Sequence, residues 1–240
     1  MIEKKCDKES KCDSKVKADK KHARDVFKLF LLKDAKFSKE NEFPMLEPVG
    51  IEVAHPKALI SFSAAMNRNC KNYNCFVHFY EDDFRFQRIW NNPRKYLSKL
   101  KKFDGVIMPD FSTSLDFIKP LKFISAYRNQ ALAVWFQNNG MIVVGNARYE
   151  PKCDFLLEGL PKHTVIAICG RACTKRIKDR RCFVRDVKAT VDKLEPSAII
   201  YYGSDYYNVM DYPRSLGIPV WMYHGCKRGE LDGGISGQFE

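Results

Sequence analysis

Six short apolar runs alternate along the chain with longer segments in which apolar and polar residues are mixed. The runs are residues 76–80, 105–108, 141–144, 164–168, 198–202 and 218–223. Runs that are apolar at successive positions are typical of strands covered on both faces of a mainly parallel sheet. The sequence therefore predicts an α/β domain built from repeated strand–helix units.

Three of the intervening segments carry apolar residues at steps of three and four, which predicts helices. These apolar stripes extend over residues 86–103, 117–135 and 183–194. The connection 205–217 contains Pro213, which predicts a brief or broken helix, and the third crossover at 151–161 is expected to be irregular. The pattern fits both a doubly wound sheet and an incomplete β/α barrel, because periodicity does not report strand order.

The two ends of the chain differ from the segment between them. Residues 1–24 are almost entirely polar and charged and are expected to form a disordered tail, and residues 225–240 a flexible glycine-rich tail. The single α/β domain is predicted over residues 25–224, with a further strand candidate at 58–63. Two prolines within residues 43–49 predict an extended arm there.

Composition narrows the possible partners. The formal net charge of +12 favours an anionic partner, either nucleic acid or a phosphorylated small molecule, although a solvated basic surface explains it as well.

No apolar stretch reaches the length of a membrane span, and the N-terminus lacks a signal-peptide pattern. The nine cysteines follow no regular framework, as expected of reduced thiols. We therefore expect a cytoplasmic protein without membrane contact.

Candidate site residues follow the predicted strands, because ligands bind beyond the carboxyl ends of parallel strands. Glu81, Asp82 and Asp110 are candidate catalytic carboxylates that could act as a general base or share a divalent metal ion. Acidic residues at strand–helix junctions also serve as helix N-caps. Arg148, beside Asn146, could hold a phosphate or form an internal salt bridge.

Further polar residues complete the predicted site. His78, Ser112 and Ser204 are candidate substrate contacts, although a histidine within a strand is also typical of a buried structural residue. No glycine-rich dinucleotide fingerprint or P-loop is present, which argues against a standard dinucleotide or ATP site and leaves the cofactor unknown. The cysteine spacing does not predict a metal site.

A dense basic cluster opens the third predicted helix. Its members are Lys175, Arg176, Lys178, Arg180, Arg181 and Arg185. They could contact the backbone of a nucleic acid, or they could be a solvated helix face.

Several long strings resemble one protein family. Residues 78–86, 89–93, 103–107, 109–112 and 127–132 resemble the family described as domain of unknown function 4417, over about residues 40–223. Its members are common in phages and other mobile elements, so the resemblance implies such an origin and the host-cell cytoplasm as the location. It implies no activity. The family pattern carries over at His78, Glu81, Asp82, Trp90, Asn91, Asp110, Ser112, Arg128, Asn146 and Arg148.

The resemblance weakens at two loops. Residues 146–150 read Asn-Ala-Arg-Tyr-Glu where the family leads us to expect Asn-Val-Arg-Trp-Gly, and the glycine-rich turn near residues 170–173 is altered.

Three functional hypotheses follow from the sequence. The chain could be an enzyme acting on a nucleotide or nucleic-acid phosphate through Asp110, Glu81 or Asp82 and Arg148. It could be a nucleic-acid-binding module that uses the basic cluster. It could also be an effector that binds a host or defence protein through the arm at 43–49 and the tails.

Overall fold

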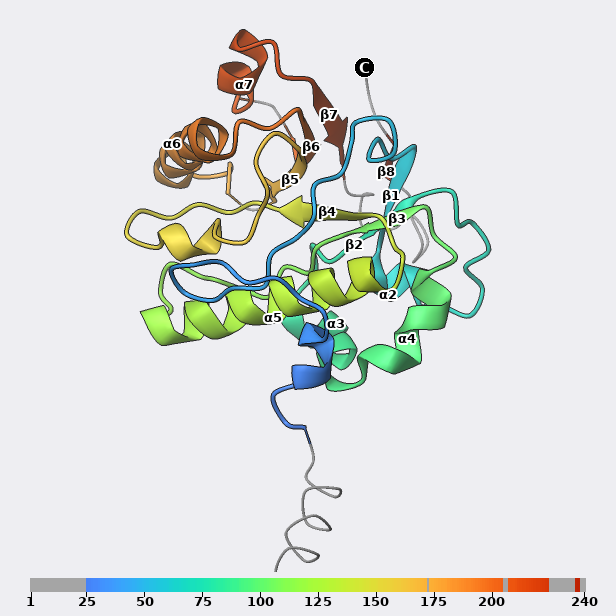
Figure 1. The fold of residues 1–240 in the computed structure, drawn as a ribbon. Helices are drawn as coiled ribbons and strands as arrows, with labels where there is room; N and C mark the ends of the chain where they lie inside the picture. Colours follow the sequence, from blue (N-terminus) through green and yellow to red (C-terminus); the bar gives the residue numbers. More distant parts are fainter. Residues whose placement is uncertain (1–24, 172, 205–206, 225–235, 238–240) are drawn as a thin grey trace, which may run out of the picture.

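Seven parallel strands follow one another in a single curved sheet that forms a nearly closed barrel, with helices between them (Figure 1). The computed structural model describes residues 25–171, 173–204, 207–224 and 236–237. The parallel strands are β1 (Ala58–Ser61), β2 (Phe76–His78), β3 (Gly105–Ile107), β4 (Val143–Asn146), β5 (Val165–Cys169), β6 (Ala198–Tyr202) and β7 (Val220–Tyr223). The sequence prediction of an α/β parallel-sheet fold is confirmed.

The order of the strands distinguishes the two predicted architectures. Neighbours in the sheet are also neighbours in the chain, from β1 through to β7. A doubly wound sheet reverses its direction of growth at a switch point, and a β/α barrel does not. The incomplete barrel is therefore the correct alternative.

A short eighth strand, β8 (Ser236–Gly237), lies at the gap in the barrel. It pairs antiparallel with β1, where Leu59 faces Ser236. A hydrogen bond also links the two sides of the gap: the hydroxyl of Tyr223, the last residue of β7, donates to the carbonyl of Pro56, just before β1. The sequence did not predict β8, which lies in the expected flexible tail. The predicted tail at 1–24 lies outside the described residues.

The barrel interior is filled by alternate strand residues. Phe76, Ile107, Val144 and Ile200 belong to one buried cluster that fills it. Gly105 is small for a physical reason, since a Cβ atom at this position would lie 2.6 Å from the ring of Phe76. A packed interior leaves the carboxyl ends of the strands as the place for a site.

The other strand residues point outward and pack against the helices. Val77, Val106, Ile166 and Ile199 belong to the larger core cluster between barrel and helices. Burial on both faces explains why the strand segments are apolar at successive positions.

The helices cover the outside of the barrel (Figure 1). They are α2 (Phe62–Ala65), α3 (Asp83–Asn91), α4 (Pro93–Leu100), α5 (Lys119–Asn138), α6 (Ile177–Leu194) and α7 (Asp211–Ser215), with 3-10 turns η1 (Leu29–Leu32) and η2 (Asp154–Leu156). The predictions of an irregular third crossover and a brief last helix are confirmed, since η2 and α7 occupy these connections.

Three local predictions need correction. The apolar stripe over residues 86–103 forms two helices, because Asn92 accepts a hydrogen bond from the Lys95 amide and begins α4 with Pro93 in its first turn. The strand predicted at 58–63 ends at Ser61, whose hydroxyl oxygen caps α2 by accepting from the Ala64 amide at 3.3 Å. The strand predicted at 141–144 lies at β4, two residues later.

The arm at 43–49 is extended, as predicted, but it is not free. Phe43 and Leu46 are buried, and the ring of Phe43 packs against Phe123 and Phe155. The arm therefore belongs to the fold, which removes the main sequence feature behind the effector hypothesis.

Candidate active site

The candidate site lies at the carboxyl ends of β3 and β4, where the chain leaves the barrel. Asp110 follows β3, Asn146 is the last residue of β4, and Arg148 comes two residues later. Sequential pairing of β3 with β4 brings these positions to the same end of the sheet. This placement agrees with the position predicted from the sequence.

Four polar side chains form one hydrogen-bonded cluster here. Asn146 donates from Nδ2 to Oδ1 of Asp110 at 3.0 Å, and Arg148 donates from Nη2 to the other carboxylate oxygen at 3.3 Å. The hydroxyl of Tyr80 donates to Oδ1 of Asn146 at 3.0 Å. Residues from the loops of three strands thus fix the carboxylate of Asp110.

Burial and charge set the electrostatics of this cluster. Burial raises the pKa of Asp110, and the nearby carboxylate of Asp83 adds to the rise, while the Arg148 guanidinium and the Asn146 amide oppose it. The pKa of Arg148 is raised by Asp110. The side chain of Arg148 is 39% exposed against 13% for Asp110, so the guanidinium is the more accessible partner. A buried carboxylate of raised pKa beside an accessible cation is a common arrangement in active sites.

Side chains of α5 hold the loop that carries Asp110. Asn129 accepts a hydrogen bond from the Phe111 amide at 2.8 Å and donates to the Phe111 carbonyl at 3.4 Å. The guanidinium of Arg128 lies over the rings of Trp90 and Phe111. Because Phe111 follows Asp110 directly in the chain, these contacts to Phe111 also hold Asp110 in place.

His78 lies inside the barrel, next to the cluster. It is 3% exposed. Its ring stacks on that of Tyr80 with centroids 5.2 Å apart and lies tilted against that of Tyr202 with centroids 4.6 Å apart. Its Nδ1 accepts from the Tyr80 amide at 3.1 Å, which places the proton of the neutral ring on Nε2. Burial, with a contribution from Arg171, lowers the pKa of His78 to about 3. These contacts favour a packing role for His78 over substrate contact.

The other candidates after β2 and β3 have separate partners. Glu81 accepts from the Ser63 amide at 2.9 Å, within α2. Asp82 is exposed at the N-cap position of α3, without a side-chain capping bond. Ser112 donates from its hydroxyl to Asp83 at 2.9 Å. None of these bonds joins the Asp110 cluster.

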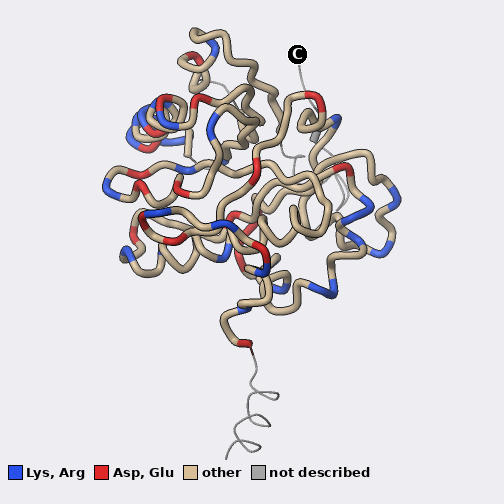
Figure 2. Tube along the Cα trace, in the orientation of Figure 1, with Lys and Arg blue, Asp and Glu red and all other residues tan. Residues whose placement is uncertain are grey.

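The remaining candidates lie near α6 and β6. Ser204 is exposed and its carbonyl accepts from the Tyr201 hydroxyl at 3.3 Å. The guanidinium of Arg180 lies 3.5 Å from the centre of the Tyr207 ring. Lys175, Arg176 and Arg181 are exposed. Figure 2 shows basic and acidic residues mixed along α6 rather than a uniformly basic face.

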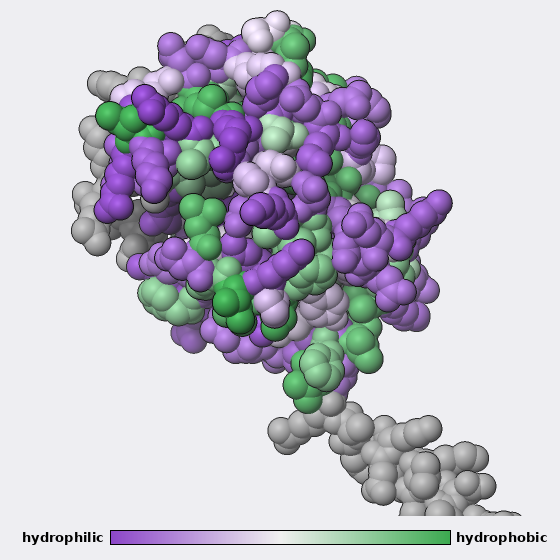
Figure 3. Space-filling view, turned by 90° about the vertical axis from the view of Figure 1, so that its left-hand side faces the viewer, coloured by the Kyte–Doolittle hydropathy of each residue, from purple (hydrophilic) through white to green (hydrophobic). Residues whose placement is uncertain are grey.

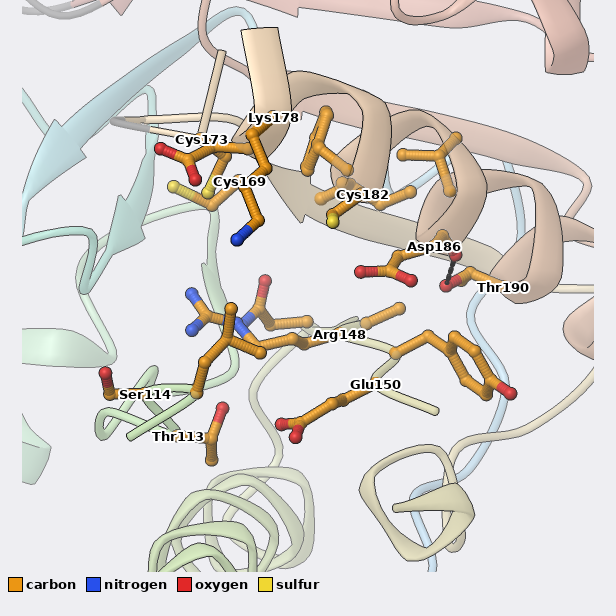
Figure 4. Close-up of a pocket in the computed structure, with 18 of the residues that line it drawn as sticks. Thr113, Ser114, Arg148, Glu150, Cys169, Cys173, Lys178, Cys182, Asp186 and Thr190 are labelled. Carbon is orange, nitrogen blue, oxygen red and sulfur yellow. Dashed lines mark hydrogen bonds between the residues drawn. The ribbon is translucent and has the colours of Figure 1, made fainter. Parts of the chain in front are cut away.

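A cavity of about 470 Å³ opens beside the cluster, between α6, the loop after β3 and the segment after β4. This volume is within the range of small-molecule sites. Side chains from one face of α6 line it at steps of four: Lys178, Cys182, Asp186 and Thr190 (Figure 4). Arg148 lines it from the opposite wall and thereby joins the cavity to Asp110.

A second, small cavity of about 20 Å³ lies behind Arg148. Its lining includes Asp110, Thr113, Asn146 and Gln130. The small cavity adjoins the large one, because both are lined by Thr113, Asn146 and Arg148. Oγ1 of Thr113 and Oε1 of Gln130 are buried without a hydrogen-bond partner among the described residues. A polar space of this size holds about one water molecule.

Sequence reasoning missed several residues of this site. The sequence pattern predicts Tyr80 only as part of an apolar strand, although a tyrosine at a strand end can present its hydroxyl there. Lys178 is predicted only as a possible nucleic-acid contact, and Cys182 and Asp186 are not predicted as site residues. The spacing of four residues between these three was the available signal, because it places them on one helical face.

In the described part of the chain, no group of three or more His, Cys, Asp or Glu side chains is placed to hold a metal ion. No described helix is both long enough and apolar enough to cross a membrane.

Comparison with known proteins relates the chain to phage proteins. It is 25% identical to the Gene 1 protein of Mycobacterium phage L5 over 189 residues, which cover 77% of this chain and 81% of the relative. It is 24% identical to the Gene 1 protein of Mycobacterium phage D29 over 148 residues, which cover 60% of this chain and 55% of that relative. No solved structure matches the chain.

A family model also matches the chain, over residues 35–218. This range contains the Asp110 cluster and the cavity beside α6, and it confirms the resemblance recognised from the sequence strings. The chain belongs to the family described as a domain of unknown function, DUF4417.

Proposed function

We propose that this protein is an enzyme acting on a small substrate that bears a phosphate, either a nucleotide or the end of a nucleic acid. One observation carries the proposal: Arg148 contacts the largely buried carboxylate of Asp110 and also lines a cavity of about 470 Å³. A guanidinium binds phosphate through paired hydrogen bonds, and only one of its donors contacts Asp110.

Each residue of the cluster has a role in this proposal. Arg148 binds the phosphate, and the carboxylate of Asp110 accepts or returns a proton during the reaction. The raised pKa of Asp110 suits this role, because a general base works best when its pKa approaches the working pH. Asn146 and Tyr80 are positioning residues, since they act by orienting the carboxylate.

The test is a turnover screen of the full chain against phosphorylated substrates, nucleotides and 5′-phosphorylated oligonucleotides included. The Asp110→Asn variant is expected to lower kcat by about a hundredfold or more and to leave the melting temperature within a few degrees. Arg148→Lys is expected mainly to raise KM. Arg94→Lys is the matched control, because Arg94 packs on Phe30 and lines neither cavity.

Two results would overturn the proposal. One is the absence of turnover and of binding across the whole panel. The other is full activity in Asp110→Asn with the fold intact. If Asp110→Asn loses its folded structure together with activity, Asn146→Asp and Tyr80→Phe test the cluster instead, through their effect on the pH profile of kcat.

Binding of nucleic acid through the basic cluster is the second candidate. The exposed side chains of Lys175, Arg176 and Arg181 favour it. Affinity would then fall steeply as salt rises, and replacing Lys175 and Arg181 by Glu would weaken binding for every sequence tested. The absence of a complex at low salt would eliminate this candidate.

A further inference from the structure

We propose that the cavity beside α6 binds an elongated phosphorylated molecule of nucleotide size, with its phosphate at Arg148 and Lys178 and an amino-bearing group at Asp186. The inference rests on the proposed function, because it starts from the phosphate site at Arg148. It adds the chemistry of the other end of the ligand.

The first argument is the separation of charge along α6. Lys178 and Asp186 are two positions of the face that lines the cavity, and both side chains point into it (Figure 4). They are eight residues apart, which corresponds to about 12 Å along a helix axis. Arg176 and Asp179 also line the cavity beside Lys178, so this end of α6 contributes two cations and one carboxylate and, with Arg148, has a net positive charge. The cavity therefore has a basic end and an acidic end that a single phosphate ion cannot contact together.

The basic end is formed from two elements. Arg148 projects from the segment after β4, and Lys178 extends from the first turn of α6 toward it (Figure 4). Lys178 is exposed and Arg148 is partly exposed, so both cations can reach a ligand. A fixed guanidinium and a mobile ammonium are together suited to a phosphate group.

The acidic end depends on Asp186. Its side chain is 19% exposed, and the two hydrogen bonds from Arg185 both go to Oδ1, at 2.9 and 2.7 Å. Oδ2 is therefore the oxygen that can accept from a ligand. Burial raises the pKa of Asp186, and N–H donors of a ligand would compensate that burial. Glu150 is a poorer acceptor, because Lys122 already binds both its oxygens, at 2.6 and 2.8 Å.

Apolar side chains also line the cavity. Phe183 lies between Lys178 and Asp186 along α6, and Leu115 and Val187 complete the apolar part of the lining; such side chains suit the faces of a flat ring. Figure 3 views the molecule from the side of α6, and the surface there is mainly hydrophilic with scattered apolar residues. Phosphate, flat ring and amino group in that order describe a nucleotide whose base carries an exocyclic amino group.

The experiment is calorimetric titration of the full chain with inorganic phosphate and with AMP, CMP, GMP and UMP. UMP is the control ligand, because its base has no amino group. At least one amino-bearing nucleotide is expected to bind tenfold or more tightly than UMP. Asp186→Leu, which has no hydrogen-bond acceptor, should remove this difference and leave the affinity for inorganic phosphate unchanged.

Two matched variants identify the ends of the ligand. Arg148→Met should abolish binding of phosphate and of every nucleotide. Asp192→Asn, which changes an exposed carboxylate on the same helix outside the cavity, should change nothing. A 5′-phosphorylated oligonucleotide titrated alongside separates a free nucleotide from a nucleic-acid end, and a preference for amino-bearing terminal bases supports the inference in either case.

The failures of the two proposals are distinguishable. If phosphate binds through Arg148 but UMP binds as tightly as the amino-bearing nucleotides, this inference is wrong and the proposed function stands. If neither phosphate nor any nucleotide binds the wild-type chain, the proposed function itself is wrong. The comparison of ligands uses wild-type protein, so it remains decisive even if Asp186→Leu does not fold.

Discussion

The guanidinium of Arg148 lies 3.3 Å from the carboxylate of Asp110, although 38 positions of the chain separate the two residues. Pairing of β3 with β4 brings them together at one end of the barrel. Because Arg148 also lines the large cavity, this pair connects a buried acid to a space that a ligand can occupy. The pair is the structural basis of the predictions below.

Asp110 should make stability depend on pH. Its pKa is raised in the folded chain, so the folded state holds the proton more strongly than the unfolded state does. The stabilisation of the folded state by this proton is therefore fully present below pH 3.8, the ordinary pKa of an aspartate, and is lost as the pH rises through the raised pKa of Asp110. As the pH rises through this range, wild type loses this stabilisation, whereas Asp110→Asn has no carboxyl proton to lose. The free energy of unfolding of Asp110→Asn should therefore increase relative to that of wild type by at most about 1.4 kcal/mol per pH unit.

Urea unfolding of both proteins from pH 4 upward measures this difference. A constant gap between wild type and Asp110→Asn at every pH would show that the carboxylate has no shifted pKa. Glu47→Gln is a suitable control, because Glu47 is 63% exposed and belongs to a surface ion pair.

His78 should make stability depend on pH in the opposite direction to Asp110. Its pKa is lowered to about 3 from 6.5 by burial, so the unfolded chain binds the proton more readily. Stability should be complete above pH 6.5 and should fall toward pH 3, with a slope of up to about 1.4 kcal/mol per pH unit. In His78→Gln this part of the acid sensitivity should disappear in the same urea titrations, and an unchanged slope would contradict the assignment.

Tyr80 should stabilise the site through its hydroxyl. Tyr80→Phe leaves Oδ1 of Asn146 without its donor in a buried position, which costs about 1–3 kcal/mol. A double-mutant cycle with Asn146→Ala measures the coupling, which should be at least 0.5 kcal/mol, roughly the lower limit for residues in contact. Additive effects of the two changes would mean that the hydrogen bond contributes nothing.

The largely buried ion pair of Lys122 with Glu150, which lines the cavity, should be far more sensitive to substitution than an exposed ion pair. The Lys122 side chain is 4% exposed and its Nζ lies 2.6 Å from Glu150. Glu150→Gln leaves this charge buried and unpaired, at a cost of about 3–5 kcal/mol. Glu47→Gln removes an exposed pair and should cost less than about 1 kcal/mol. Thermal unfolding of the two variants compares them, and equal losses would contradict this account.

The sequence predicts much of the barrel, because the period of the apolar residues reports which faces are buried. It could not predict closure of the sheet, since strand order and the pairing of Leu59 with Ser236 depend on distant contacts. The split between α3 and α4 was available locally, in Asn92 followed by Pro93.

The sequence also predicts which residues of the candidate site lie close together, but only in part. Asp110, Asn146 and Arg148 follow adjacent strands, and their strand-end positions were sufficient to group them. Glu81 also follows a strand, but its carboxylate turns to the Ser63 amide, and no local pattern reports that choice. Asp186 belongs to the cavity only because α6 packs beside the loops of β3 and β4.

The most direct test of the central claim is a crystal structure of the full chain soaked with a nucleoside monophosphate. The account predicts a phosphate group within hydrogen-bonding distance of the Arg148 guanidinium, inside the cavity between α6 and the β4 loop. A ligand bound elsewhere, or a cavity that stays free of ligand at saturating concentration while Arg148 keeps its contact with Asp110, would contradict it.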